Sequence, residues 1–386
     1  MTILSDLDVS HKSLTPLHIQ IQRQIRELIL SGTYPTGSRL PSETQLQQHL
    51  NVSRTTVRVA LHSIEAEGLI ERIPGKGTFV ADIRLGNGKY SDRYTIHFMT
   101  HDFDNRSQRL LLTGAESFAR ASGYQIMFRN SVHDFHEEKS LLEEARQQGA
   151  SGVVLWSTLH QQLIPDLIEV INNQRFPCVM MDRTIDALDC DYVASDNYAG
   201  GRQAMQHLLD LGHQHIVFLT HSYLTLLPVA ERVRAYRAAL HEAGLPHNDL
   251  WSVGQPDTEI NGSQFMRALE FPHESPLVQQ VVSCLRETAP TAIFALNDYM
   301  GVLAMKAARI VGLRVPEDIS IIGFDDADIA CFLEIPLTTI AQDTYRIGQR
   351  AAEMLAERME GCNHPRRWEF IPTELRARAS TAPPSR

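Results

Sequence analysis

Two arginines one helical turn apart, with hydroxyl side chains between them, are the residues best suited to chemistry in this chain. Arg54 and Arg58 flank Thr55 and Thr56, and Ser53 stands directly before them. Serine at that place is typical of a helix N-cap, and residues at i and i+4 share one face of a helix. Guanidinium and hydroxyl groups at the start of a helix can bond to base edges and phosphates in the DNA major groove. We therefore expect Arg54 and Arg58 to contact DNA, with Arg54 nearer the base edges.

The elements that would position this helix can be predicted from the apolar spacing around it. Three helices are expected, at 16–31, from residue 42 onward, and at 53–67. Two strands are expected after them, at 69–73 and 78–80. Ser42 and Gln45 have the spacing of a capping box at the second helix. Two helices joined by a short turn and followed by a hairpin make a winged helix-turn-helix, which we place over residues 12–80.

The turn of that hairpin is a second candidate contact with DNA. Gly75, Lys76 and Gly77 combine a positive charge with two residues that permit close backbone approach, so they can follow a phosphate backbone or the minor groove. Phosphate-positioning roles are expected for three hydroxyl side chains: Ser42, Thr55 and Thr56. A capped helix start or a Gly-Lys-Gly turn is common on protein surfaces, and only their order along the chain makes the assignment specific.

Over about residues 14–80 the chain resembles the GntR family of bacterial regulators. The matching segments are LILSG (28–32), GSRLPSE (37–43), VSRTTVR (52–58), EGLI (67–70) and GKGTFV (75–80). The resemblance implies DNA contacts by Arg54, Arg58 and the wing around Gly75. Many family members carry Arg directly after the Pro-Ser-Glu, whereas this chain has Thr44, so the operator sequence does not carry over.

Composition divides the chain into a basic head and an acidic remainder. The 386 residues are too many for one ordinary domain, and their net charge is −10. Residues 12–90 carry ten Lys and Arg against six Asp and Glu, a net +4, which leaves about −14 elsewhere. The five cysteines are scattered, no run of eighteen apolar residues occurs, and the first residues lack a signal-peptide pattern. We expect a cytoplasmic protein with free thiols and no membrane segment.

After a polar linker at 81–93, strand and helix patterns alternate. Expected strands are 94–99, 124–128, 152–156, 177–181, 192–193, 216–220, 292–296 and 320–323; expected helices are 110–121, 137–148, 163–173, 199–211, 229–243, 275–287 and 300–311. Such alternation is typical of parallel sheets covered by helices on both faces. The fold class is therefore α/β, with two doubly wound parallel-sheet subdomains behind the winged head.

Polar side chains that follow these strands are candidates for a ligand site, because ligands of such sheets bind beyond the carboxyl ends of the strands. They are Thr100, His101, Asp102, Ser157, Thr158, Asp182, Arg183, Thr220, His221, Asn297, Asp298, Asp325 and Asp326. Carboxylates, amides and guanidiniums together suit a polyhydroxylated ligand. A single polar residue after a strand is more often a loop or cap residue, so the argument depends on several converging.

Over about residues 94–380 the chain resembles the effector-binding and dimerisation core of LacI/GalR-type repressors, which has the type I periplasmic-binding-protein fold. The matching segments include PCVMMDR (177–183), VASDNYAG (193–200), HLLDLGH (207–213), ALND (295–298) and VPEDISIIGFDD (315–326). Sugar-facing roles are implied for Asp182, Arg232, Asn297 and Asp325, with Arg183 as a further candidate. We assign this domain to residues 94–386.

The chain lacks the motifs of common enzyme and metal sites. It has no G-x-G-x-x-G after a strand, no G-x-x-x-x-G-K-[ST], no H-E-x-x-H and no G-x-S-x-G, so no catalytic residue, cofactor or metal is expected. His213 and His215 are expected in a surface turn. In the run from Asp325 to Asp328, one acid should face the cleft while the others are solvated or cap the next helix.

The two resemblances together predict an effector-controlled DNA-binding regulator. A GntR-type head on a LacI-type body is similar to the arabinose-responsive repressor group, which makes a repressor answering a small sugar, first of all a pentose, the leading hypothesis. A homodimer on an inverted-repeat operator is expected, because +4 is little charge for tight binding by a single head. The alternatives are a regulator answering a non-sugar metabolite such as a nucleoside, and a small-molecule-binding protein or enzyme whose head does not regulate transcription.

Overall fold

The chain divides into two units, residues 1–93 and 94–386, in the computed structural model. We call the first the head and the second the body. The structure describes residues 7–10, 15–30, 32–66, 69–73, 76–81, 95–103, 106–221, 224–246, 250–255, 262–362 and 364–385. The predicted linker at 81–93 lies outside these residues except for Ala81.

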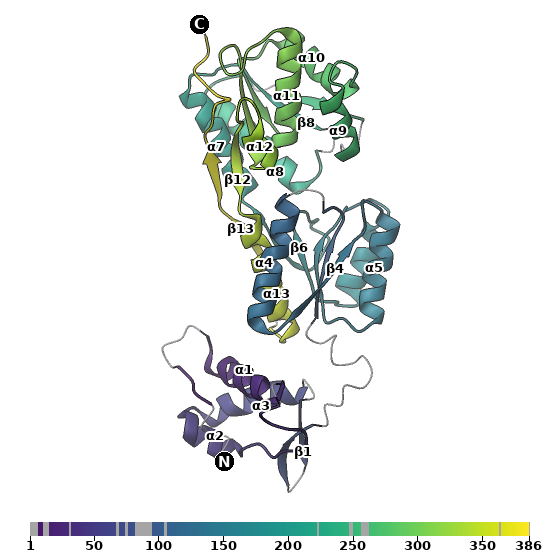
Figure 1. The fold of residues 1–386 in the computed structure, drawn as a ribbon, viewed down its shortest axis with the longest axis vertical. Helices are drawn as coiled ribbons and strands as arrows, with labels where there is room; N and C mark the ends of the chain where they lie inside the picture. Colours follow the sequence, from purple (N-terminus) through teal and green to yellow (C-terminus); the bar gives the residue numbers. More distant parts are fainter. Residues whose placement is uncertain are drawn as a thin grey trace. The chain divides into compact units, whose positions relative to one another are not determined.

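Within its described residues, the head contains three helices and a two-stranded hairpin. They are α1 Leu17–Leu30, α2 Glu43–Leu50, α3 Arg54–Ala66, β1 Ile70–Ile73 and β2 Gly77–Val80. The strands pair antiparallel with Arg72 opposite Thr78. One stripe of each helix is buried against the others, including Ile21, Leu46 and Leu61. The predicted winged helix-turn-helix is confirmed (Figure 1).

The first lobe of the body is a parallel sheet in the order β13-β7-β6-β5-β3-β4. Its strands are β3 Thr95–Thr100, β4 Gln125–Asn130, β5 Val153–Trp156, β6 Cys178–Met181, β7 Asp191–Ser195 and β13 Trp368–Ile371. Its helices are α4 Arg106–Ser122, α5 Phe135–Gln147, α6 Ile164–Ile168, the π-helix η3 Glu169–Asn173 and α13 Thr344–Met359. The central strands are apolar throughout because helices cover both faces.

The second lobe has the strand order β14-β12-β11-β10-β8-β9. Its strands are β8 Ile216–His221, β9 Leu250–Val253, β10 Ala292–Ala295, β11 Ser320–Asp325, β12 Thr338–Gln342 and β14 Thr373–Arg376. Its helices are α7 Asn197–Asp210, α8 Leu227–Glu242, α9 Gly262–Glu270, α10 Pro276–Thr288, α11 Asp298–Val311 and α12 Asp328–Phe332. Only β14 among them runs antiparallel to its neighbour. Two doubly wound subdomains were predicted, and the two six-stranded sheets confirm them.

In the part of the body that the structure describes, the chain crosses between the two lobes three times. The crossings lie at Asp196 between β7 and α7, at Asp343 between β12 and α13, and at Pro372 between β13 and β14. Asp196 caps α7 through Ala199 N and Asp343 caps α13 through Arg346 N. The Asp196 amide also donates to the Ile371 carbonyl at 2.8 Å, so two crossings are hydrogen-bonded side by side.

Several predicted boundaries and one local environment differ in the structure. The predicted helix 163–173 is α6 followed by η3, and seven elements were not predicted: β9, α9, α12, β12, α13, β13 and β14. His213 was expected in a surface turn, and that was wrong. It is 1% exposed, and its ring bonds to Thr291, Ser320 and the Ala382 carbonyl, which fastens the C-terminal segment to the second sheet.

Helices α4 and α13 lie side by side in Figure 1 and touch through glycines. A Cβ added at Gly348 would lie 1.9 Å from the Leu111 carbonyl oxygen, and one at Gly114 would lie 1.9 Å from the Tyr345 carbonyl oxygen. Backbone therefore meets backbone in this pair. No helix in the described parts of the chain is both long and apolar enough to cross a lipid bilayer.

We predict that Gly348→Ala destabilises the body by about 1–3 kcal/mol, because the added methyl group overpacks this contact. Helix propensity alone would change stability by about 1 kcal/mol in the opposite direction. Urea unfolding of the full chain measures the difference. An equally or more stable variant would show that the two helices can separate without loss.

Candidate functional site

The N-terminal turn of α3 presents the predicted DNA contacts. Ser53 Oγ accepts from the Thr56 amide at 3.0 Å, so the serine caps the helix as expected. Val57, Leu61 and Ile64 are buried against the rest of the head. The opposite side of the turn carries the exposed residues Arg54, Thr55 and Arg58. The structure therefore places both arginines on one accessible surface.

A carboxylate beneath this surface ties three elements together. Glu43 at the start of α2 lies 3.5 Å from Arg54 and 3.5 Å from Arg72 of β1, and Arg72 lies 3.0 Å from Glu65 of α3. The Arg54 side chain remains 70% exposed. Glu43 thus limits the positions of the Arg54 guanidinium without removing it from solvent.

The remaining predicted head residues have mixed surroundings. Ser42 forms the expected capping box with Gln45, and the Thr56 hydroxyl bonds to Ser53, so both hydroxyls already serve helix caps. Lys76 is exposed, and Gly77 has φ 119°, a conformation that favours glycine. Gly75 lies outside the described residues.

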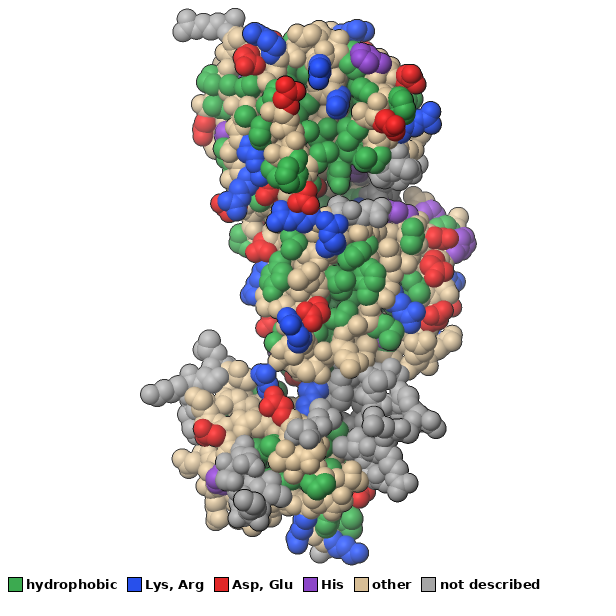
Figure 2. Space-filling model, viewed as in Figure 1, with side chains coloured by type: hydrophobic (Ala, Val, Ile, Leu, Met, Phe, Trp, Pro, Cys, Tyr) green, Lys and Arg blue, Asp and Glu red, His purple; other side chains and the backbone are tan. Residues whose placement is uncertain are grey.

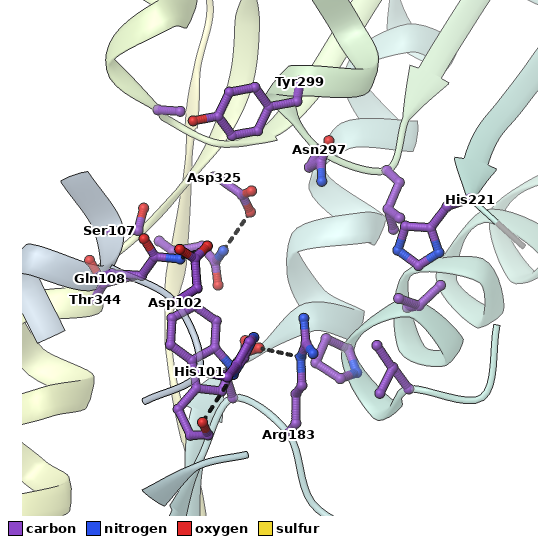
Figure 3. Close-up of a pocket in the computed structure, with 18 of the residues that line it drawn as sticks. His101, Asp102, Ser107, Gln108, Arg183, His221, Asn297, Tyr299, Asp325 and Thr344 are labelled. Carbon is purple, nitrogen blue, oxygen red and sulfur yellow. Dashed lines mark hydrogen bonds and ion pairs between the residues drawn. The ribbon is translucent and has the colours of Figure 1, made fainter. Parts of the chain in front are cut away.

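A cavity of about 580 Å³ in the body is lined by residues of both lobes. In Figure 3, Asn297, Tyr299 and Asp325 lie on one side of it, and His101, Asp102 and Arg183 lie on the other. Eight of the predicted ligand residues line this cavity: His101, Asp102, Asp182, Arg183, His221, Arg232, Asn297 and Asp325. The strand ends of two sheets therefore converge on one space, as the doubly wound fold requires.

The Arg232 guanidinium is the most constrained group in the wall. The Arg232 side chain is 7% exposed, Nε donates to Asn197 Oδ1 at 2.9 Å, and Nη1 donates to the Leu296 carbonyl at 2.7 Å. Its guanidinium carbon lies 3.6 Å from the centre of the Phe324 ring. Nη2 lies 3.6 Å from Asp325 Oδ1. The charge is held in place before any ligand arrives.

Asp325 is an unusual carboxylate in both conformation and proton affinity. Its φ of 111° is a backbone conformation that non-glycine residues rarely adopt, and such strain is concentrated at functional sites. Gln342 Nε2 donates to its Oδ1 at 2.6 Å. Burial raises the pKa of Asp325 to about 6, although Arg232 and the Gln342 hydrogen bond oppose the rise.

The opposite wall carries a second set of paired polar groups. Asp182, which also has positive φ (59°), lies 3.7 Å from the Arg183 Nε. Asp102 accepts from Gln108 Nε2 at 2.6 Å and lies 3.8 Å from His133 Nε2. Each carboxylate can accept further hydrogen bonds from a ligand.

The other six predicted ligand residues do not line the cavity: Thr100, Ser157, Thr158, Thr220, Asp298 and Asp326. Thr100 and Ser157 lie behind its wall. Thr100 is 3% exposed and its hydroxyl donates to the Asp102 carbonyl at 2.7 Å. Ser157 is fully buried and its Oγ accepts from the Leu159 amide at 2.9 Å. Neither lines the cavity, because short hydroxyl side chains turn back to the adjacent backbone. The structure therefore does not place these two, which were predicted to contact the ligand, on the surface of the cavity.

Two ion pairs connect the lobes beside the cavity, and we call them the latch. Arg106 Nη1 and Arg109 Nη2 of α4 lie 3.5 and 3.8 Å from the carboxylate of Asp328 in α12. Their sequence neighbours Ser107, Gln108 and Ala327 line the cavity. The same two segments therefore face the ligand space and join the lobes.

The aspartates after β11 are paired rather than arranged around a cation. Asp326 pairs with Arg378, and Asp328 belongs to the latch. Asp325 lines the cavity, and Asp328, whose side chain is 49% exposed, lies in the first turn of α12. Among the residues that the structure describes, no group of three His, Cys, Asp or Glu side chains has a geometry suited to a metal ion.

Comparison with known proteins agrees with both units. Residues 17–80 match the family "Bacterial regulatory proteins, gntR family", and residues 205–381 match "Periplasmic binding protein-like domain". The arabinose metabolism transcriptional repressor of Geobacillus stearothermophilus is 30% identical over 349 residues, which cover 89% of this chain and 92% of that protein. The chain belongs to the transcriptional repressors of the GntR and LacI type.

Other similar proteins agree with this family. The HTH-type transcriptional repressor PurR of Aliivibrio fischeri is 32% identical over 271 residues, covering 70% of this chain and 76% of that protein. A LacI family transcriptional regulator from Enterococcus faecium, solved with bound ribose, has a TM-score of 0.61 and 26% identity, covering 75% of this chain and 100% of that one. The repressor therefore has a DNA-binding head and an effector-type body.

Several cavity residues of the repressor were not predicted as ligand residues. They are Gln108, His133, Trp156, Tyr299, Gln342 and Thr344. Trp156 ends β5 and directly precedes the predicted Ser157, so a strand-end search extended by one residue would have found it. The others lie on helices or loops, or at the end of the unpredicted strand β12, and no spacing in the sequence signals their direction.

We predict that a ligand whose hydroxyl groups donate to Asp325 binds well above pH 6 and loses up to about tenfold in affinity per pH unit below it. The ionised carboxylate accepts these hydrogen bonds, whereas the protonated form holds a hydrogen of its own. Calorimetric titration between pH 5 and 8 measures the profile. Asp325→Asn should bind weakly and lose this inflection; an unchanged inflection would assign it to another group.

Proposed function

We propose that the repressor binds an inverted-repeat operator through the heads of a homodimer and responds to a small neutral sugar, first of all a pentose, in the cavity of the body. The observation that supports a sugar ligand is the convergence of five polar side chains around one cavity: Asp102, Asp182, Arg232, Asn297 and Asp325. We assign the protein no catalytic role. Because its target is DNA, we place it in the cytoplasm.

The pairing of charges favours a neutral polyol over an anion. Each sugar hydroxyl donates one hydrogen bond and accepts others, which matches a wall that mixes carboxylates, an amide and guanidiniums. Arg232 faces Asp325 and Arg183 faces Asp182, so both cations already have a carboxylate partner. A phosphorylated ligand would have to compete with these partners.

Relatives support the same ligand class. The similar Enterococcus faecium regulator was solved with ribose, and a relative that matches nearly the whole chain is named for arabinose metabolism. A nucleoside remains a second candidate, because the aromatic side chains of Trp156, Phe265 and Tyr299 in the wall can stack on a base as well as on a sugar ring.

The DNA contacts proposed are those of α3 and the wing. Arg54 and Arg58 would reach base edges, Ser42, Thr55 and Thr56 would position phosphates, and Gly75, Lys76 and Gly77 would follow the backbone. A net charge near +4 is small for one head, so two heads on a two-fold-related site are needed for tight binding.

Control of DNA binding would come from the angle between the lobes. A ligand that contacts both walls favours one angle, and the three crossings and the latch would follow it. Coupling between effector and operator is typically about 1–3 kcal/mol, or about 5–150-fold in affinity. The linker at 81–93 would transmit this change to the heads.

We predict that the double variant Arg54→Ala/Arg58→Ala loses operator binding by about 100-fold or more while binding effector normally. Asp325→Ala should show the reverse, with intact operator binding and no effector response. Fluorescence anisotropy with an operator selected from randomised duplexes measures the first, and calorimetry with pentoses, hexoses and nucleosides measures the second.

These paired variants separate the parts of the proposal. Effector-dependent DNA binding that survives in Asp325→Ala would contradict the assigned cavity. Binding of nucleosides but no sugar would replace the ligand class and leave the DNA function standing. A monomer in sedimentation analysis on the operator would contradict the homodimer.

We predict that Asp328→Asn weakens effector binding about twofold to fivefold, because the latch joins the lobes by exposed ion pairs, each of which contributes at most about 1 kcal/mol. Asp318→Asn is the matched control, since Asp318 pairs with Arg314 inside one lobe. Equal effects in both variants would show that the latch has no special role in closure.

A further inference from the structure

The exposed surface of α3 is wider than its two arginines. Val57, Ala60, Leu61 and Ile64 are buried in the head. Among the residues of α3 whose burial the structure describes, the exposed ones are Arg54, Thr55, Arg58, Val59 and His62. At about 100° per residue these five occupy one continuous arc of about 140°, with Arg54 at one edge and Val59 at the other. If the arginines lie in the major groove, Val59 lies there too.

Val59 is the apolar residue on an otherwise polar exposed surface of α3. Val59 is 43% exposed, and within the described residues of the head it is the one large hydrophobic residue exposed to this degree. A β-branched residue lowers helix propensity, so Val59 does not serve the helix itself. The nearby Ser63 hydroxyl donates to the Val59 carbonyl at 3.1 Å, so this bond involves the backbone of Val59 and not its side chain.

The DNA major groove offers one apolar group that complements such a side chain. Thymine carries a C5-methyl group there, whereas cytosine presents an amino group and no methyl. Cationic neighbours on the same arc would hold the helix against the groove while Val59 meets the methyl. Contact between these groups removes apolar surface of both from water.

We propose that Val59 contacts the C5-methyl group of a thymine in each operator half-site and so specifies thymine over cytosine at that position. The inference rests on the proposed role of α3 in DNA recognition and adds to it a residue that reads a base without hydrogen bonds. Arg54 and Arg58 then select hydrogen-bonding base edges, and Val59 selects a methyl group beside them.

The test removes the methyl group from the DNA rather than from the protein alone. An operator is selected from randomised duplexes with the full wild-type chain, and each thymine is then replaced symmetrically by deoxyuridine, which differs only in that methyl. One replacement should weaken binding by about fourfold per half-site, or about tenfold or more for the pair. In Val59→Ser the same replacement should change affinity by less than about twofold.

Controls separate this contact from general effects of the substitutions. The remaining thymines of the operator, and the variant Val132→Ser at an exposed valine of the body, should keep the wild-type pattern. If no thymine is sensitive in the wild type, or if Val59→Ser retains the full sensitivity, the assignment to Val59 is overturned. Failure to select any duplex would overturn the proposed DNA function and this assignment together.

Discussion

A buried guanidinium is costly unless it is paired and hydrogen-bonded, and the wall of the cavity is arranged around that requirement of Arg232. Burial lowers the pKa of this side chain, and Asp325 is foremost among the groups that oppose the shift. Its other partners are Asn197, directly after a chain crossing, and the Leu296 carbonyl, directly after β10. One charge thus fixes a crossing and two strand ends relative to one another. The two strand ends, at Leu296 and Asp325, form part of the cavity wall.

The sequence predicts those residues of the candidate site that directly follow buried strands. Asp182, Asn297 and Asp325 each come at or just after the end of a buried strand, so the two parallel sheets bring them to the edges that face the cavity. Thr100 obeys the same rule and still turns away, because its hydroxyl bonds to a neighbouring carbonyl. Gln108 could not be predicted, since the direction of α4 depends on how that helix packs.

The same limit applies to the fold. The stripe of Ile347, Ala351 and Leu355 is sufficient to predict α13 as a helix, although it was not predicted here. The sequence around α13 does not show that this helix packs on the first lobe. That placement depends on the chain crossing from the second lobe back to the first at Asp343. The short strands β13 and β14 are separated by Pro372 alone and enter different sheets. An alternating apolar pattern can predict a strand, but it does not show which sheet the strand joins.

The crossings also set the order in which the molecule can be completed during synthesis. The head closes its core within the first eighty or so residues and can fold while the rest emerges. The first lobe cannot, because its sheet waits for β13 and its α4 waits for α13, and both come after the second lobe has been translated almost entirely. A ribosome-bound chain stopped before residue 344 would carry a folded head beside a body with an uncovered apolar face. The part that binds DNA is thus ready before the part that controls it.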